Sequence, residues 1–256
     1  MSQAHGAPYT CAMDATQPNG ITLVGFDADD TLWRSQDYFD AAQAEFERII
    51  SAYVDLTDIG RQLYEHEARN IAIFGYGVKG MVLSMVEAAV TITDARITAT
   101  DIHRIVQLGK ELLRHPVEVL PGIREAVEVI ARDFPVVLIT KGDLFHQEAK
   151  VRDSGLADLF GRIEIVSEKD PATYARVLRE FEVSPSQFLM VGNSLRSDIA
   201  PVLELGGWGI HVPYHVTWVH EAEGKVDVGI ERMRSIAGID QLAAAVDALR
   251  AQALLG

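Results

Sequence analysis

The sequence predicts an α/β protein, a doubly wound parallel sheet with an inserted α-helical cap domain. From about residue 121 onward, short apolar runs rich in β-branched residues alternate with helical patterns, which implies right-handed β-α-β crossovers and a parallel sheet. From about residue 37 to 115, by contrast, apolar residues recur at helical spacing with no convincing strand between them. We therefore expect a flexible leader at 1–17, a core formed by 18–36 and 116–256, and a cap at 37–115.

The first predicted strand covers residues 21–26 (ITLVGF), and a group of acids follows it directly. Its continuous apolar run is typical of a strand that is buried on both faces. Asp27 and Asp29 project to the same side of an extended chain, so both carboxylates can reach one small volume. They repel each other unless a cation lies between them or one holds a proton, which suits metal-assisted acid/base or nucleophilic chemistry. The alternative is an Asp-rich turn that caps the following helix.

The remaining elements follow from the spacing of apolar residues. Four helical patterns make up the predicted cap, at about 39–53, 58–71, 78–89 and 102–113. In the core, further strands are expected at 135–139, 163–166, 188–191 and 209–212. Helices are expected before, between and after these strands, at about 123–130, 144–154, 174–181, from 198, and from 241.

Polar residues follow four of the predicted strands where each strand ends. In parallel sheets of this kind, ligands bind outside the carboxyl ends of the strands, so these residues should meet at one edge. The group combines acids, a hydroxyl, a lysine and an amide, and comprises Asp27, Asp29, Thr140, Lys169, Asn193 and Asp198. This composition favours a catalytic site over a set of ordinary polar loops.

These residues, in this order, resemble the haloacid dehalogenase superfamily, whose members are mostly phosphohydrolases. The four motifs of that family correspond to D-x-D-x-T at 27–31, to Thr140, to Lys169, and to the acidic motif at 192–198. The helical insert lies where the family has its C1-type cap, and the resemblance covers essentially residues 21–213.

The resemblance implies a phosphatase that acts on a small phosphorylated metabolite. Asp27 would attack the phosphate ester and become a phosphoaspartate, and Asp29 would protonate the leaving oxygen and later activate water. Thr140 would donate to the phosphoryl oxygens, and Lys169 would stabilise the charge of the transition state. We also expect Lys141, which follows Thr140, to contact the substrate.

The resemblance further implies Mg²⁺ as the cofactor, because this ion prefers carboxylate and carbonyl oxygens. Its ligands would be Asp27, the main-chain carbonyl of Asp29, Asp198 and Asn193. Asn193 stands where the family usually has an acid, and its amide brings an oxygen but no charge. The sequence therefore predicts a magnesium site of reduced affinity.

The stretch at 75–80 (GYGVKG) matches G-x-G-x-x-G, but it lies between two cap helices and not in a β-α-β unit. We interpret it as a cap loop whose glycines let Tyr76 and Lys79 approach the active site and bind substrate. The alternative is an ordinary turn between helices.

Three other functions are alternatives to a phosphatase. A 2-haloacid dehalogenase has no use for a proton-donating acid at the position of Asp29, so we favour a phosphatase. A β-phosphoglucomutase-like phosphotransferase has the same motifs. The third alternative is a non-catalytic binding or regulatory protein of this fold, and Asn193 is the sequence feature that supports it.

Composition limits the partners. The 37 acidic and 23 basic residues give a formal net charge of −14, which argues against binding to nucleic acid or to anionic membranes. No run of about 18 apolar residues that could span a membrane is present, and the first residues lack the features of a secretory signal. With the single cysteine, Cys11, this predicts a cytoplasmic protein, a monomer or homodimer, with a small-molecule phosphate ester as its partner.

Overall fold

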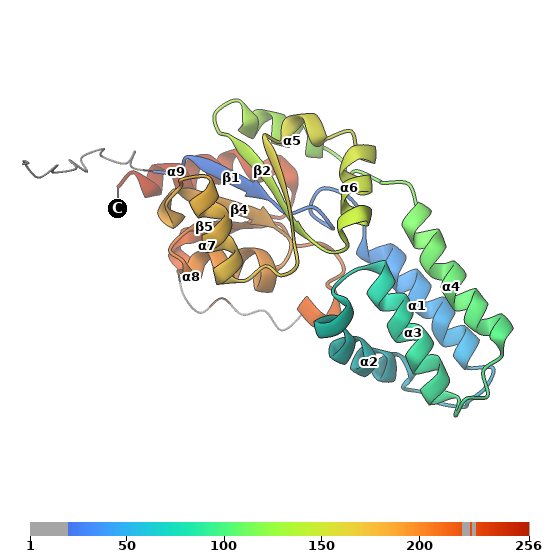
Figure 1. Cartoon of the computed structure of the whole chain (residues 1–256). Helices are drawn as coiled ribbons and strands as arrows, with labels where there is room; N and C mark the ends of the chain where they lie inside the picture. The colour runs from blue at the N-terminus through green and yellow to red at the C-terminus, as the bar shows by residue number, and fades with distance from the viewer. Residues whose placement is uncertain (1–19, 222–225, 227–228, 256) are drawn as a thin grey trace, which may run out of the picture.

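The computed structural model describes residues 20–221, 226 and 229–255. The predicted leader at 1–17, with Cys11, lies outside the described residues. The described chain forms two parts, a sheet with helices on both faces and a group of four helices beside one end of it (Figure 1).

The sheet has six strands in the order β3-β2-β1-β4-β5-β6, and every neighbouring pair is parallel. This confirms the predicted fold class. The strands are β1 (Leu23–Phe26), β2 (Val136–Lys141), β3 (Arg162–Val166), β4 (Phe188–Gly192), β5 (Trp208–His211) and β6 (Met233–Ser235).

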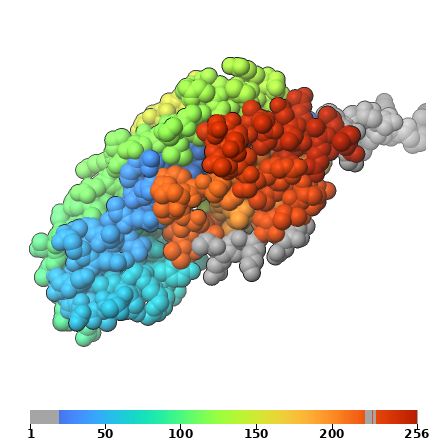
Figure 2. Space-filling view, turned by 180° about the vertical axis from the view of Figure 1, so that it is seen from behind, coloured from blue at the N-terminus to red at the C-terminus, as the bar shows by residue number. Residues whose placement is uncertain are grey.

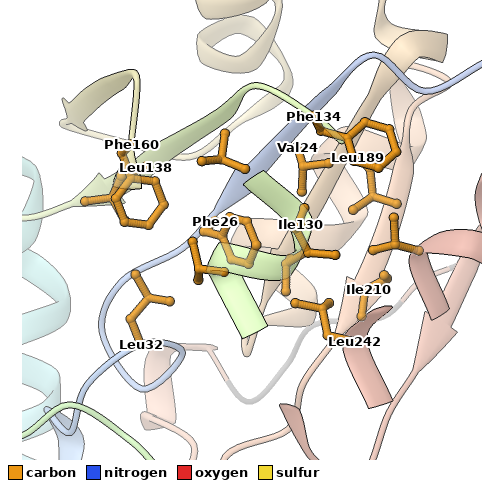
Figure 3. Packing of buried hydrophobic residues seen from close by; sticks show 14 of the residues in the cluster. Val24, Phe26, Leu32, Ile130, Phe134, Leu138, Phe160, Leu189, Ile210 and Leu242 are labelled. Carbon is orange, nitrogen blue, oxygen red and sulfur yellow. The ribbon is translucent and has the colours of Figure 1, made fainter. Parts of the chain in front are cut away.

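Burial on both faces of the sheet explains the continuous apolar run of the first strand. Successive residues of β1 point to opposite faces, so Val24 and Phe26 join one apolar cluster and Leu23 joins another. Figure 3 shows the first cluster, where Phe26 and Val24 lie among side chains of neighbouring strands and helices. The helices of this part are α5 (Ile123–Ala131), α6 (Leu144–Asp153), α7 (Pro171–Glu180), α8 (Ala200–Glu204) and α9 (Leu242–Ala253).

The other part, here called the cap, consists of α1 (Gln36–Ile50), α2 (Ile59–Phe74), α3 (Val78–Ile92) and α4 (Ala99–Arg114). It has its own apolar cluster, in which Phe46, Leu63, Met85 and Ile105 are fully buried. A Cβ atom on Gly109 of α4 would lie 2.3 Å from Val82 Cγ2 of α3, so the glycine permits close packing of these two helices. The apolar residues that recur at helical spacing in the sequence thus pack against one another inside the cap.

The structure has one strand more than the sequence predicts and shifts the bounds of other elements. Strand β6 was not predicted, because its three residues, Met-Arg-Ser, carry no apolar pattern and its evidence is backbone pairing with β5. Strand β5 runs one residue earlier than expected, and α2 continues to Phe74, three residues further than predicted. None of the described helices is both long and apolar enough to cross a lipid bilayer.

Phe26 offers a direct test of the core. Its side chain is fully buried at the end of β1, so Phe26→Ala should lower the free energy of unfolding by about 3–5 kcal/mol through lost burial and a cavity. Denaturant unfolding followed by circular dichroism measures this change. Phe145→Ala is the matched control, because that ring is 74% exposed and its loss should cost less than about 0.5 kcal/mol. Equal effects of the two substitutions would contradict the placement of Phe26.

Candidate active site

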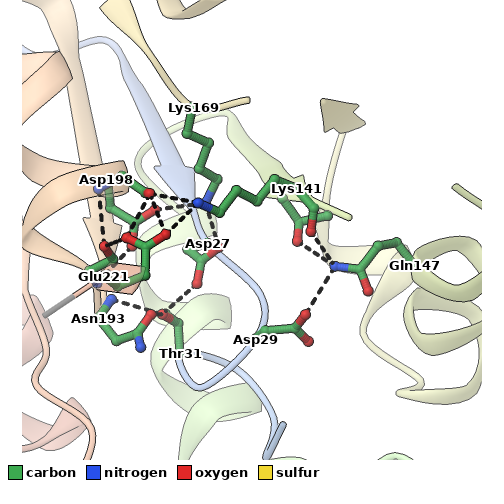
Figure 4. A network of polar contacts seen from close by, with 12 residues as sticks. Asp27, Asp29, Thr31, Lys141, Gln147, Lys169, Asn193, Asp198 and Glu221 are labelled. Atoms are coloured by element: carbon green, nitrogen blue, oxygen red, sulfur yellow. Dashed lines mark hydrogen bonds and ion pairs between the residues drawn. The ribbon is translucent and has the colours of Figure 1, made fainter. Parts of the chain in front are cut away.

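A cavity lies where the carboxyl ends of β1, β2 and β4 face the cap. It encloses about 1260 Å³, which includes space open to solvent. Its walls include every candidate catalytic and metal-binding residue of the sequence analysis, namely Asp27, Asp29, Thr140, Lys141, Lys169, Asn193 and Asp198. Figure 4 shows how six of these side chains, all except Thr140, converge from separate segments of the chain.

Asp27 is the centre of this group. Lys169 Nζ contacts Asp27 Oδ1 and lies 2.7 Å from Asp198 Oδ1, and all three side chains are buried. Burial, with repulsion from Asp198, raises the pKa of Asp27 to about 7, although Lys169 opposes the shift. Burial alone would lower the pKa of Lys169, but Asp198 and Asp27 raise it well above its usual value, so Lys169 carries a charge. The Lys169 ammonium thus pairs with two buried carboxylates at once.

Asp29 faces the same cavity but has its own cation. Lys150 Nζ lies 2.5 and 2.7 Å from the two carboxylate oxygens, and Trp33 Nε1 donates to Oδ1 at 2.7 Å. Burial tends to raise the pKa of Asp29, yet Lys150, Trp33 and Gln147 together hold it below its usual value. The expected repulsion between the two acids is therefore relieved by two different lysines.

Asp30 has a structural role instead. Its backbone has a positive φ of 62°, and its carboxylate accepts the backbone N–H groups of Ser35 at 2.8 Å and Gln36 at 3.0 Å. These donors belong to the first turn of α1, where helices have no backbone partners for them. Asp30 also lines the cavity, but its carboxylate caps a helix, whereas those of Asp27 and Asp29 pair with lysines.

The end of β2 places Thr140 and Lys141 in the cavity. Gln147 of α6 donates to Thr140 Oγ1 at 2.7 Å and to Asp29 Oδ2 at 3.1 Å, so it connects the two. Lys141 Nζ lies 2.9 Å from Ser197 Oγ, contacts Glu221, and sits 4.3 Å from the centre of the Tyr76 ring. Its charge is thus already paired with a carboxylate of the protein.

The fourth motif is built tightly around Asp198. The backbone N–H of Ser194 donates to Asp198 Oδ2 at 2.9 Å. A Cβ atom on Gly192 would lie 2.2 Å from that same oxygen, so only glycine fits there. Asn193 is tied to the first motif, since its backbone N–H donates to Thr31 Oγ1 at 3.0 Å and the Thr31 hydroxyl donates to Asp27 Oδ2 at 2.9 Å.

Glu221 is part of the site although no sequence motif indicated it. It accepts hydrogen bonds from Ser197 Oγ at 2.7 Å and from Ser194 Oγ, and it pairs with Lys141. Burial tends to raise the pKa of Glu221, but Lys141 and the two serines hold it below its usual value. A carboxylate from a distant segment thus stands beside the motif in which Asn193 replaces an acid.

The segment of residues 212–221, which ends at Glu221, also contacts the cap. Tyr214 Oη donates to Asp37 Oδ2 at 2.5 Å, and His215 Nε2 lies 2.7 Å from Asp37 Oδ1. Figure 2 shows the molecule from behind, where an orange part of the chain lies against the blue part. The segment therefore joins the cap to the fourth motif.

The two cap residues predicted to bind substrate are placed differently. Tyr76 lines the cavity and donates from its hydroxyl to Glu168 Oε2 at 2.6 Å. Positive φ values at Gly75 (74°) and Gly77 (103°) allow the turn that brings it there. Lys79 is not a lining residue; its side chain is 53% exposed and its ammonium lies 2.9 Å from Asp143 at the start of α6.

The oxygen atoms available at the site suit Mg²⁺ better than a metal ion whose ligands are all protein side chains. Among the described residues, no three Asp, Glu, His or Cys side chains are grouped so that they could hold a metal ion. Asp27 and Asp198 supply two carboxylates to the cavity wall, the lining residue Asn193 has a neutral amide oxygen, and the main-chain carbonyl of Asp29 would add a second neutral oxygen. Such a partial set suits an ion that keeps several of its waters.

Comparison with known proteins supports one family. The model of the haloacid dehalogenase-like hydrolases matches residues 21–206. A solved haloacid dehalogenase-like family hydrolase from Xanthomonas campestris is 56% identical, with a TM-score of 0.82 over 92% of this chain and 94% of that one. No curated protein sequence matches the chain.

More distant structures share the fold alone. A predicted phosphoglycolate phosphatase from Haemophilus somnus has 16% identity and a TM-score of 0.59 over 88% of this chain and 97% of its own. A 2-haloacid dehalogenase from Pseudomonas syringae has 24% identity and a TM-score of 0.57 over 89% and 98%, respectively.

The ion pair between Glu221 and Lys141 should contribute to the free energy of unfolding. Glu221→Gln keeps an acceptor for the two serines but removes the charge, so the free energy of unfolding should fall by about 1–3 kcal/mol near neutral pH. Because the folded-state pKa of Glu221 lies below its ordinary value of 4.5, this contribution is present above that value and disappears as pH falls through the lower folded-state pKa.

Denaturant unfolding of both proteins over this pH range measures the difference. Glu111→Gln, an exposed change of the same charge on α4, should be without effect. A difference between wild type and Glu221→Gln that stays constant at all pH values would contradict the assigned pairing.

Proposed function

The chain belongs to the haloacid dehalogenase-like hydrolases, and within this family we propose that it is a Mg²⁺-dependent phosphatase of small phosphorylated metabolites. The observation that carries the proposal is the pair Asp27 and Asp29, which share one cavity but have separate electrostatic environments. Two carboxylates with different neighbours can take different roles, one as nucleophile and one as proton carrier.

The second acid favours a phosphatase over a dehalogenase. An alkoxide that leaves phosphorus needs a proton, whereas a halide leaves as a stable anion and needs none. Asp29 lines the cavity with its oxygens fixed by Lys150, Trp33 and Gln147, so it is oriented for proton transfer. This precise support would serve no purpose in displacing a halide.

In the first step, a carboxylate oxygen of Asp27 attacks the phosphorus. An O–P bond forms to Asp27, the bond between phosphorus and the alcohol oxygen breaks, and that oxygen takes a proton from Asp29. The bound phosphate ester is an anion beside Asp29, and a like charge raises the pKa of a carboxyl, which favours the protonated form that this step needs.

In the second step, water attacks the phosphoaspartate. Asp29, now a carboxylate next to Lys150, accepts a proton from the water, the Asp27–phosphorus bond breaks, and inorganic phosphate leaves. Thr140 and Lys169 stand where they can stabilise the phosphoryl oxygens in both steps, and Gln147 holds the Thr140 hydroxyl in place.

Mg²⁺, when bound, would neutralise charge on the nucleophile and the phosphoryl group. The site has a need for this, because in the described part of the chain Lys169 is the one cation paired with Asp27 and Asp198, and the pKa of Asp27 is raised by burial and by Asp198. The residues that would hold the ion are Asp27, Asp198, the main-chain carbonyl of Asp29 and Asn193. The cap closes the other side of the cavity, which would keep water from the ester until the phosphoaspartate forms.

Hydrolysis of p-nitrophenyl phosphate tests this proposal. We expect release of nitrophenolate with Mg²⁺, little without it, and a loss of at least about 10³-fold in Asp27→Asn, because the amide is not a nucleophile. Asp133→Asn, an exposed change of the same kind between α5 and β2, is the matched control. Activity retained by Asp27→Asn would exclude the nucleophile, and turnover of 2-haloacids in place of phosphate esters would favour a dehalogenase.

Asp29→Asn should separate the two steps. Nitrophenolate is a good leaving group, so the first step needs little proton donation, whereas the second step still needs a base. Rapid-mixing kinetics should therefore show a burst of about one product per site followed by turnover slowed about 10²–10⁴-fold. A variant that loses the burst together with turnover would show that Asp29 has another role.

A further inference from the structure

The cavity has a cationic and an acidic side. Three lysines line it, Lys141, Lys150 and Lys169, and all of them belong to the core and are already paired with carboxylates. Among the described residues, no Lys or Arg of the cap lines the cavity. Positive charge is thus confined to the end where the phosphoryl group reacts.

The cap contributes neutral and acidic groups to the opposite wall. Its polar lining residues are Gln36, Gln43, Glu67, Asn70, Tyr76 and Ser84. Glu67 is the acid among them, and its side chain is only 13% exposed. The part of a substrate that extends from the phosphoryl group toward the cap therefore meets no cation there within the described chain.

Glu67 lacks a hydrogen-bond partner among the described residues. The nearest base is His220, whose Nε2 lies 3.6 Å away, beyond hydrogen-bond distance, and this buried nitrogen also has no partner. His220 cannot turn freely, because its ring is stacked on Tyr64 with centroids 4.3 Å apart. A carboxylate with so little exposure is costly unless donors reach it, so Glu67 is ready to accept hydrogen bonds from a ligand.

Asn70 repeats this pattern one helical turn further along α2. Its Nδ2 donates to Glu87 Oε2 at 2.7 Å and to Ser84 Oγ at 3.2 Å, while its Oδ1 accepts from no described residue. Residues three apart share a face of a helix, so Glu67 and Asn70 present two acceptors to the same cavity. The wall is thus suited to a ligand that donates hydrogen bonds.

We propose that Glu67 and Asn70 select the alcohol part of the substrate, so that the enzyme takes phosphate monoesters of hydroxyl- or ammonium-bearing alcohols and rejects phosphorylated carboxylates. The inference rests on the proposed phosphatase function and narrows its substrate class. A second anion on the substrate would approach Glu67 on a wall to which the described cap contributes no Lys or Arg, and the repulsion between the two anions is a basis for discrimination.

Binding to the Asp27→Asn protein tests this without turnover. Phosphoethanolamine and phosphoglycolate are matched probes, because they differ in carrying an ammonium or a carboxylate at the same distance, and glycerol phosphate adds a probe with hydroxyls. With Mg²⁺ present, calorimetric titration should show at least about tenfold tighter binding of phosphoethanolamine or glycerol phosphate than of phosphoglycolate. The tighter of these two shows which donor the wall prefers.

Adding Glu67→Gln should reduce this preference to about threefold or less, because the amide does not repel a carboxylate. Glu111→Gln, an exposed change on cap helix α4, should leave it intact. Tighter or equal binding of phosphoglycolate, binding of none of the probes, or a preference unchanged by Glu67→Gln would overturn the proposal. A preference found in a protein whose wild type hydrolyses no phosphate ester would instead overturn the phosphatase function alone.

Discussion

Lys169 lies between the buried carboxylates of Asp27 and Asp198, and the rest of the site is arranged around this contact. Bringing these charges out of water is costly, and it is tolerable only if each group has partners in a fixed geometry. The fold supplies them from separate elements: Asp27 at the end of β1, Lys169 before α7, and Asp198 after β4. A parallel sheet provides this geometry because its strands end at one edge.

The second half of the arrangement keeps Asp29 apart from that contact. Lys150 and Gln147 reach it from α6, the helix that follows β2, so the two acids of the first motif face one cavity with different partners. The cap completes the cavity with groups of a different character, because its wall carries acceptors and no lysine or arginine among the described residues. In the proposed function, reaction and substrate selection are divided between two parts of the chain that have separate apolar clusters.

Much of this could be predicted from the sequence, because buried strands and the acids, hydroxyl and lysine that follow them leave a local pattern. The fold class, and the meeting of Asp27, Thr140 and Lys169 at one edge, depend on that pattern alone. Lys150 could not be identified, since a lysine on an amphipathic helix looks the same whether it faces solvent or a carboxylate. Glu221 lies in a segment without periodicity, and its contacts depend on how that segment crosses the sheet edge. Lys79 was expected at the substrate, but it is the second residue of α3 and its ammonium pairs with Asp143.

The central claim is that Asp27 carries the phosphoryl group between the two steps. The direct measurement is rapid acid quenching of the wild-type protein during turnover of a phosphate ester, followed by peptide mass spectrometry. We expect a phosphoryl group on the peptide that contains Asp27, attached to that side chain and cleaved by hydroxylamine as an acyl phosphate. Turnover with no phosphorylated peptide, or with the phosphoryl group on another residue, would contradict it.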